Sequence, residues 1–100
     1  MTGGLRVLLY YVTADAAGIE AAYHRASEHL AGVPGLLGNE LLRSVPEPSG
    51  FVVVSSWRTL ADFEEWERGP DHKRQSAPLR PFQDTKMSRP FGIYRVTASY

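Results

Sequence analysis

The alternation of hydrophobic and polar residues divides the chain into strand-like and helix-like segments. Four segments rich in β-branched and aromatic residues have the length of strands, and two longer-period segments favour helices. In chain order, the expected elements are strand 5–13, a helix from about 15 to 31, strand 36–44, strand 51–57, a helix from about 60 to 68, a short helical turn at 70–76 and strand 91–99. The order β-α-β-β-α-β predicts an α+β, ferredoxin-like fold with an antiparallel four-stranded sheet.

Signals at the ends of the predicted helices support this division. Either Thr13 or Asp15 can cap the first helix, and Gly32 ends it. Thr59, with an acidic residue three positions later, resembles a capping box at the start of the second helix. Gly69 and Pro70 break that helix, and the turn-forming segment 46–50 joins the second and third strands as a hairpin.

The first predicted strand is hydrophobic on both faces. One face carries Leu5, Val7, Leu9 and Tyr11, and the other carries Leu8, Tyr10 and Val12. Because two helices cover only one face of a four-stranded sheet, the second face needs another partner. A monomer that exposed it would be prone to aggregate. We therefore expect a homodimer in which two copies pack sheet against sheet with two-fold symmetry.

Composition narrows the classes of partner. One hundred residues predict a single domain spanning 1–100. Eleven basic and eleven acidic residues cancel, which argues against nucleic acid and against an anionic membrane surface. The chain has no cysteine, and its hydrophobic run 5–12 is too short to span a membrane. With no basic leader at the amino end, a cytoplasmic location is expected.

A set of short motifs along the chain adds a family resemblance. The motifs are Pro34-Gly35 with Gly38, Leu41-Leu42-Arg43, Trp57, the pair Phe63 and Trp66, His72 after Gly69-Pro70, and Pro81-Phe82 before the last strand. In this order the chain resembles the antibiotic biosynthesis monooxygenase family of dimeric α/β-barrel proteins. The resemblance implies a barrel shared by two chains, with a pocket between the sheet and the helices of each chain.

Two residues are candidates for catalysis in such a pocket. His72 lies where the pocket wall is expected, and an imidazole there can act as a general base near neutral pH. Trp66 lies at the edge of its helix's hydrophobic stripe, where an indole N–H can reach a ligand. Simple packing is the alternative for both residues.

Further residues are expected to bind substrate in the same pocket. These predicted substrate-binding residues are Tyr11, Tyr23, Asn39, Trp57 and Phe63. They combine aromatic walls with a few polar groups, which is typical of small-molecule sites. Arg43, Arg89 and Arg95 are candidates to hold a phenolate or carboxylate, with surface pairing as the alternative for each.

The histidines do not predict a metal site. His24 and His29 lie five positions apart on one helix, so they face different directions and cannot share an ion. Glu20, His24 and Glu28 do align, but they lie away from the hydrophobic stripe and are expected to form a solvated face. No metal and no cofactor are therefore expected.

The resemblance implies cofactor-independent oxygenation of an aromatic polyketide-type molecule, such as an anthrone or a naphthol, by dioxygen. Deprotonation lets such a substrate supply the electrons itself. The chain departs from quinone-forming members at two positions, because Val53 stands where they have asparagine and Phe63 where they have tyrosine.

Two alternatives remain open. One is a noncatalytic ligand-binding or cyclase-like accessory dimer, since a fold alone does not fix an activity. The other is a haem-binding or haem-degrading protein, for which Trp66 is suitably placed. That alternative needs an asparagine on the first strand and a histidine nine or ten residues after Trp66. The first strand has no asparagine, and Gln75 stands at the ninth position.

Overall fold

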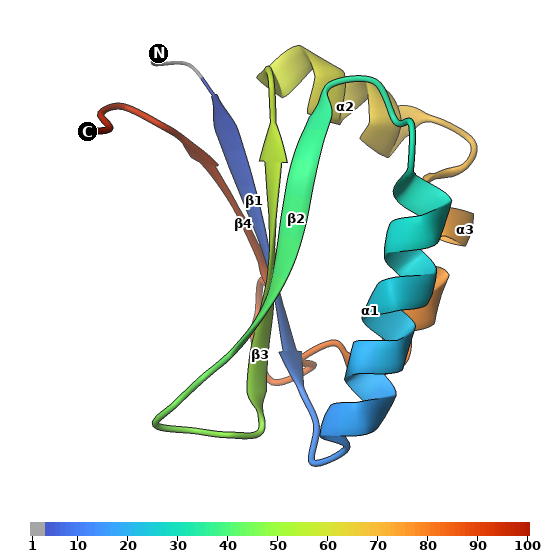
Figure 1. The fold of residues 1–100 in the computed structure, drawn as a ribbon, viewed down its shortest axis with the longest axis vertical. Coiled ribbons are helices and arrows are strands. Elements are labelled where there is room, and N and C mark those ends of the chain that lie inside the picture. Colours follow the sequence, from blue (N-terminus) through green and yellow to red (C-terminus); the bar gives the residue numbers. More distant parts are fainter. Residues whose placement is uncertain (1–3) are drawn as a thin grey trace.

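The structure, a computed structural model, describes residues 4–100 and contains one four-stranded sheet with helices on one side (Figure 1). The elements in chain order are β1 (Leu5–Val12), α1 (Ala16–Leu30), β2 (Leu36–Arg43), β3 (Gly50–Trp57), α2 (Leu60–Arg68), α3 (His72–Ser76), the 3-10 helix η1 (Ala77–Phe82) and β4 (Phe91–Arg95). The strand order is β2-β3-β1-β4 with antiparallel neighbours. The predicted ferredoxin-like fold is confirmed.

Helices α1 and α2 begin where the sequence predicts, whereas α3 begins at His72, two residues after the predicted start of the short helical turn. The Asp15 carboxylate accepts a hydrogen bond from the Gly18 backbone N–H, and the Thr59 hydroxyl accepts one from that of Asp62. These bonds satisfy backbone donors that have no partner inside the helix. Both helices lie over the same face of the sheet (Figure 1).

The carboxyl-terminal part differs from the prediction in two respects. Strand β4 ends at Arg95 and not at Ser99, because its partner β1 begins at Leu5, which pairs with Arg95. Within residues 4–100, one further backbone bond, from the Val96 N–H to the Gly4 carbonyl, continues the pairing. The segment Ala77–Phe82, for which the sequence predicted no regular element, forms a 3-10 helix, with a proline near its start, where a missing N–H costs little.

The core consists of two clusters on the helix-facing side of the sheet. The first joins β1 and β3 to α1 and η1 through Tyr11, Ile19, Ala22, Ala26, Phe51, Val53 and Leu79. The second joins the other ends of the same strands to α2 through Leu5, Val7, Trp57 and Phe63. Leu9 packs against both clusters. The interior is therefore arranged as two packed ends with a middle region between them.

The opposite face of the sheet is hydrophobic and has no helix over it (Figure 1). Leu8 pairs with Val54 and Tyr10 with Val52 across β1 and β3, and all four side chains are half-buried by one another. At the margin, Val12 is 43% exposed and Leu42 is 45% exposed. None of the helices within residues 4–100 combines the length and hydrophobicity needed to cross a membrane.

Candidate functional site

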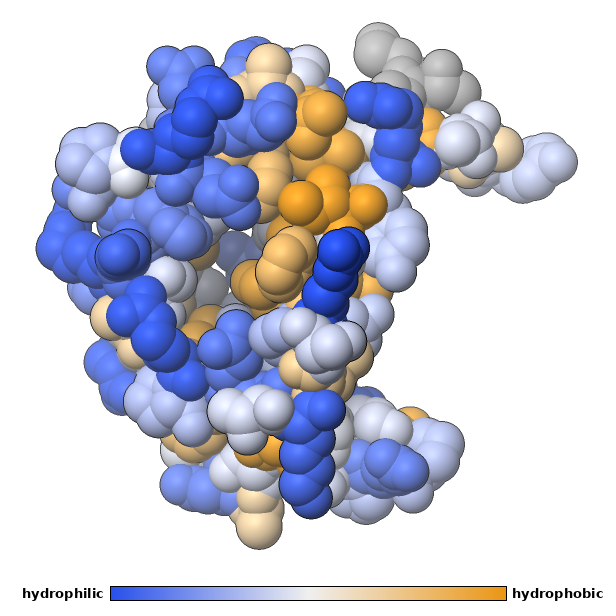
Figure 2. Space-filling view, turned by 180° about the vertical axis from the view of Figure 1, so that it is seen from behind, coloured by the Kyte–Doolittle hydropathy of each residue, from blue (hydrophilic) through white to orange (hydrophobic). Residues whose placement is uncertain are grey.

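A cavity of about 290 Å³ lies between the sheet and the helices. Members of both core clusters line it, which places it in the middle region between them. The exposed lining residues, which mark its mouth, are Glu67, Arg80, Gln83 and Phe91. Figure 2 shows the side of the molecule that faces away in Figure 1, where hydrophobic surface gathers beside a hollow. We call the cavity between the sheet and the helices the inner cavity.

The inner cavity brings together six of the seven predicted catalytic and substrate-binding residues. Tyr11, Asn39, Trp57, Phe63, Trp66 and His72 all line it. They come from β1, β2, β3, α2 and α3, so the fold gathers them from distant parts of the sequence. The seventh residue, Tyr23 of α1, does not line the cavity and lies behind Asn39.

Asn39 is held in place by two hydroxyl groups. The Tyr23 hydroxyl and the Ser27 hydroxyl, the latter at 3.3 Å, both donate to the side-chain oxygen of Asn39. The Tyr23 hydroxyl also lies 3.2 Å from the Asn39 backbone oxygen. Among residues 4–100, no acceptor pairs with the Asn39 amide nitrogen. This orientation leaves the N–H donors of Asn39 for a ligand in the cavity.

Tyr11 supplies a neutral hydroxyl. Its side chain is only 8% exposed and lines the cavity. Burial raises the pKa of Tyr11 from 10.0 to about 12, because the charged phenolate would lose its hydration. At neutral pH the group is therefore a proton donor and not a base.

Aromatic rings form one wall of the cavity. The Trp57 ring centre lies 5.4 Å from those of both Phe63 and Trp66. Trp57 donates its indole N–H to the Ser55 hydroxyl at 3.0 Å, and Trp66 donates its own to the Gln75 side-chain oxygen at 2.6 Å. Both indole donors are occupied, so this wall offers ring faces and not hydrogen bonds. The predicted donor role of Trp66 would require its bond to Gln75 to break.

His72 begins α3 and packs edge-on against Trp66. The two ring centres are 4.6 Å apart and the ring planes are perpendicular. The imidazole is half-buried, and neither ring nitrogen bonds to any group within residues 4–100. A half-buried imidazole with free nitrogens in a cavity wall can accept a proton from a bound molecule.

Gln75 and Arg80 are among the lining residues that sequence reasoning did not assign to the site. Gln75 is 8% exposed, and its position on a five-residue helix gives no periodicity from which burial could be predicted. Arg80 donates to the Lys73 carbonyl at 3.1 Å and to the Ser76 hydroxyl at 3.3 Å, which fixes its guanidinium at the cavity mouth. The sequence predicted no regular element for this segment, which carries prolines at positions 78 and 81.

The arginines that the sequence suggested do not line the cavity. Arg43 donates to the Pro48 carbonyl at 2.8 Å, and its guanidinium lies 5.4 Å from the ring centre of Phe51. Arg89 and Arg95 are also absent from the lining. The guanidinium at the cavity is that of Arg80.

The two histidines of α1, His24 and His29, are exposed. His24 lies 3.9 Å from Glu20, and both side chains are about two-thirds exposed (66% and 69%). Among residues 4–100, no cluster of three or more histidine, cysteine or acidic side chains is placed to hold a metal ion.

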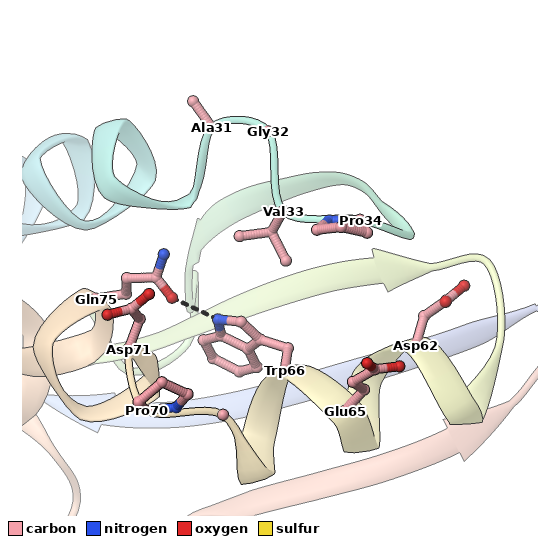
Figure 3. Close-up of a pocket in the computed structure, with 11 residues that line it drawn as sticks. Ala31, Gly32, Val33, Pro34, Asp62, Glu65, Trp66, Pro70, Asp71 and Gln75 are labelled. Carbon is pink, nitrogen blue, oxygen red and sulfur yellow. Dashed lines mark hydrogen bonds between the residues drawn. The ribbon is translucent and has the colours of Figure 1, made fainter.

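A second hollow, which we call the outer groove, lies on the far side of Trp66 and has a volume of about 420 Å³ (Figure 3). The segment 31–34 between α1 and β2 forms one of its sides, and α2 with the start of α3 forms the other. The groove carries the acidic residues Asp62, Glu65 and Asp71. The inner cavity, which is more enclosed, has the convergent polar groups and is the better binding site.

The fold and the cavity agree with a family comparison. The model of the family described as "Antibiotic biosynthesis monooxygenase" matches residues 9–77. The chain belongs to this family. The match includes both predicted catalytic residues and every predicted substrate-binding residue.

Two curated relatives of this chain come from Streptomyces. Protein SchA of Streptomyces halstedii is 30% identical over 77 residues, which cover 77% of this chain and 20% of SchA. The 42.8 kDa protein in the whiE locus of Streptomyces coelicolor is 28% identical over 76 residues, which cover 76% of this chain and 19% of that protein. The chain thus spans about a fifth of the length of these relatives.

Among solved structures, the fold is similar to that of SnoaB, a cofactor-independent oxygenase from Streptomyces nogalater. The TM-score is 0.77 at 18% identity, and the match covers 99% of this chain and 97% of SnoaB. A conserved protein from Methanosarcina mazei gives a TM-score of 0.76 at 14% identity, and the match covers 96% of this chain and 95% of that protein. At these identities the likeness establishes the family fold.

Proposed function

We propose that this chain is a cofactor-independent monooxygenase that oxidises an electron-rich fused-ring molecule of the anthrone or naphthol type. The observation that carries the proposal is the convergence of an amide donor, a neutral hydroxyl and a free imidazole on one aromatic-walled cavity. The family description and the SnoaB structure, that of a cofactor-independent oxygenase, support the same class of reaction.

The chemistry needs no electrons from the protein. Removal of a proton from the CH2 group of an anthrone gives a delocalised carbanion, which transfers one electron to dioxygen. Recombination forms a C–O bond and a peroxide anion, which then takes up a proton. Loss of the second C–H proton with cleavage of the O–O bond gives a carbonyl group and water. The balance is CH2 plus O2 to C=O plus H2O.

Each polar group in the cavity has a role in this scheme. His72 is the base that removes the first proton. The Asn39 amide donates to the enolate oxygen, and the Tyr11 hydroxyl protonates the peroxide. Arg80 at the mouth stabilises negative charge on the substrate. The aromatic wall excludes water and orients the rings.

The position of Asn39 bears on Val53, which stands where the quinone-forming members are expected to have an asparagine. In the sheet, Asn39 pairs with Ser55, and Leu41 pairs with Val53. Both Asn39 and Val53 line the cavity from adjacent strands. We infer that Asn39 supplies from β2 the amide that the quinone-forming members are expected to carry at the position of Val53 on β3.

The uncovered face of the sheet is the proposed dimer interface. Its half-buried and exposed hydrophobic side chains, described above, have no cover from this chain. A second copy related by two-fold symmetry would bury the same residues on both chains. A homodimer would also stabilise a chain of 100 residues, whose own core is small.

Oxygen uptake with anthrone tests the proposed reaction. The wild-type protein is expected to consume oxygen at a rate that exceeds buffer and heat-treated protein. His72→Gln is expected to lower kcat by about 10²–10⁴-fold, the usual contribution of general base catalysis. Asn39→Leu removes the amide donor and is expected to lower kcat by about 10²-fold or more. His24→Gln, which changes an exposed histidine outside the cavity, is the matched control and should retain full activity.

Two results would count against this function. Wild-type protein that binds anthrone tightly without oxygen uptake would favour the ligand-binding or cyclase-like accessory role. Equal loss of activity in His72→Gln and His24→Gln would remove His72 from the mechanism.

A further inference from the structure

The inner cavity and the outer groove share two lining residues. Trp66 and Gln75 are the residues common to both linings within the described chain. In Figure 3, the Trp66 ring lies across the middle of the groove, and its N–H points at the Gln75 side chain. One side of this pair therefore faces the groove and the other faces the cavity.

We propose that Trp66 and Gln75 form a removable partition that sets the length of the ring system the site admits. Displacement of the Trp66 ring joins the inner cavity to the outer groove. The ring-length limit rests on the proposed function for its substrate class, but it is a property of binding and does not depend on turnover.

The partition is held by a short chain of hydrogen bonds. Trp66 donates to Gln75 at 2.6 Å, and the Gln75 amide donates to the His29 carbonyl at 3.0 Å. That carbonyl belongs to the last turn of α1, where it has no partner within the helix. Gln75 thus ties α1, α2 and α3 together through a side chain that is 8% exposed.

The same arrangement allows the partition to open. The Trp66 ring is only half-buried and rests on Trp57 and His72 through ring contacts. Gln75 lies on a five-residue helix that follows the Gly69-Pro70 break. Side-chain hydrogen bonds and ring contacts, and not a backbone element, therefore keep the two spaces apart.

Opening the partition would enlarge the space that is open to a ligand. The inner cavity, at about 290 Å³, lies at the lower end of the range of about 300–1,000 Å³ for small-molecule sites. The outer groove adds a space of about 420 Å³ directly behind the partition. A linear four-ring molecule is longer than a two- or three-ring molecule, so we expect its last ring to reach past the partition, whereas the shorter molecules bind with the partition closed.

Charge predicts which end of a long ligand enters the groove. Arg80 and Glu67 both line the inner cavity, so their charges offset each other there. Asp62, Glu65 and Asp71 line the groove, and within residues 4–100 only two of these three carboxylates pair with an arginine, Arg58 or Arg74, which leaves the groove the more acidic space. An anionic substituent is therefore favoured in the inner cavity. The ring that passes the partition should carry neutral groups, because the acidic residues repel a carboxylate.

The experiment measures binding in the absence of oxygen, with 1-naphthol, anthrone and a linear four-ring anthrone analogue as probes. The chain has two tryptophans, so an NMR spectrum of ¹⁵N-labelled protein contains two indole N–H signals. In the wild type, the four-ring probe should shift the Trp66 signal and speed its exchange with solvent. The two smaller probes should leave that exchange rate unchanged. The Trp57 signal, whose N–H is bound to Ser55, is the internal control.

A variant tests the hydrogen bond itself. Gln75→Met keeps a side chain of similar length and removes both bonds of Gln75. It should bind the four-ring probe at least about ten-fold more tightly, equivalent to about 1.4 kcal/mol. The ratio of its affinities for the four-ring probe and for 1-naphthol should therefore exceed that of wild type. If this variant does not fold, the wild-type indole exchange measurement decides.

The proposal is overturned if the four-ring probe binds wild type without faster Trp66 exchange, or if folded Gln75→Met keeps the wild-type ring preference. Failure of the proposed function looks different. Ring-length-dependent Trp66 exchange without oxygen uptake would support the partition and remove the monooxygenase. Oxygen uptake by wild type, together with an unchanged ring preference in Gln75→Met, would support the monooxygenase and remove the partition.

Discussion

Replacing Tyr11 with phenylalanine gives the sharpest thermodynamic test of the cavity. Burial holds the pKa of Tyr11 at about 12 in the folded chain, against 10.0 for a free tyrosine. Below pH 10 the side chain is neutral in both the folded and unfolded states, so its contribution to stability is constant. Between pH 10 and 12 the unfolded state releases the proton and the folded state does not. The free energy of unfolding therefore falls as the pH rises.

The magnitude follows from the size of the pKa difference. Each pH unit in this window costs about 1.4 kcal/mol, so the full loss is about 2–3 kcal/mol. Tyr11→Phe cannot ionise and lacks this loss. Relative to wild type, the variant should gain about 1–2 kcal/mol in free energy of unfolding between pH 9 and pH 11.5.

Urea unfolding of both proteins at several pH values measures this difference directly. An ultraviolet titration provides a second measurement, because the wild-type minus variant spectrum isolates the ionisation of one tyrosine out of five. That difference should titrate near pH 12. A difference titration near pH 10, or a stability gap independent of pH, would refute the burial argument and the assignment of Tyr11 as a neutral donor.

Two further predictions concern the fold and the assembly. Gly32→Ala and Gly35→Ala both place a side chain at positive φ (84° and 82°), at a cost of about 1–2 kcal/mol each. A Cβ at Gly35 would also overlap Asp62, whereas one at Gly32 meets open space. Gly35→Ala should therefore lose at least about 1 kcal/mol more in urea unfolding, and equal losses would contradict the packing described. Val54→Lys puts a charge on the uncovered sheet face and should convert the proposed dimer to monomer in sedimentation at micromolar concentration; an unchanged dimer would place the interface elsewhere.

The sequence predicts the fold well because its local signals agree with one another. The strand at 51–57 alternates side chains between the two faces and forms β3, which pairs with β1 in the sheet. Thr59 predicts the start of α2 to the residue, because a cap depends on three or four adjacent positions. The last strand was predicted too long, since its length depends on where a distant partner begins.

The site was predicted in part for a related reason. Trp57 and Phe63 belong to patterned elements, so their direction toward the cavity follows from strand and helix periodicity. The role of Gln75 depends on a contact with a residue nine positions away and on the end of α1. Arg80 owes its place to two side-chain bonds within a 3-10 helix. Such contacts are tertiary, so they produce no periodic pattern in the sequence.

The central claim is that this chain inserts one atom of dioxygen into an aromatic substrate without a cofactor. The most direct measurement is a single-turnover reaction of metal-stripped protein with anthrone under ¹⁸O2, followed by mass spectrometry of the product. The account predicts a quinone that carries one ¹⁸O atom, with the second ¹⁸O atom in water. Product without ¹⁸O, or turnover that returns only when a metal or flavin is added, would contradict it.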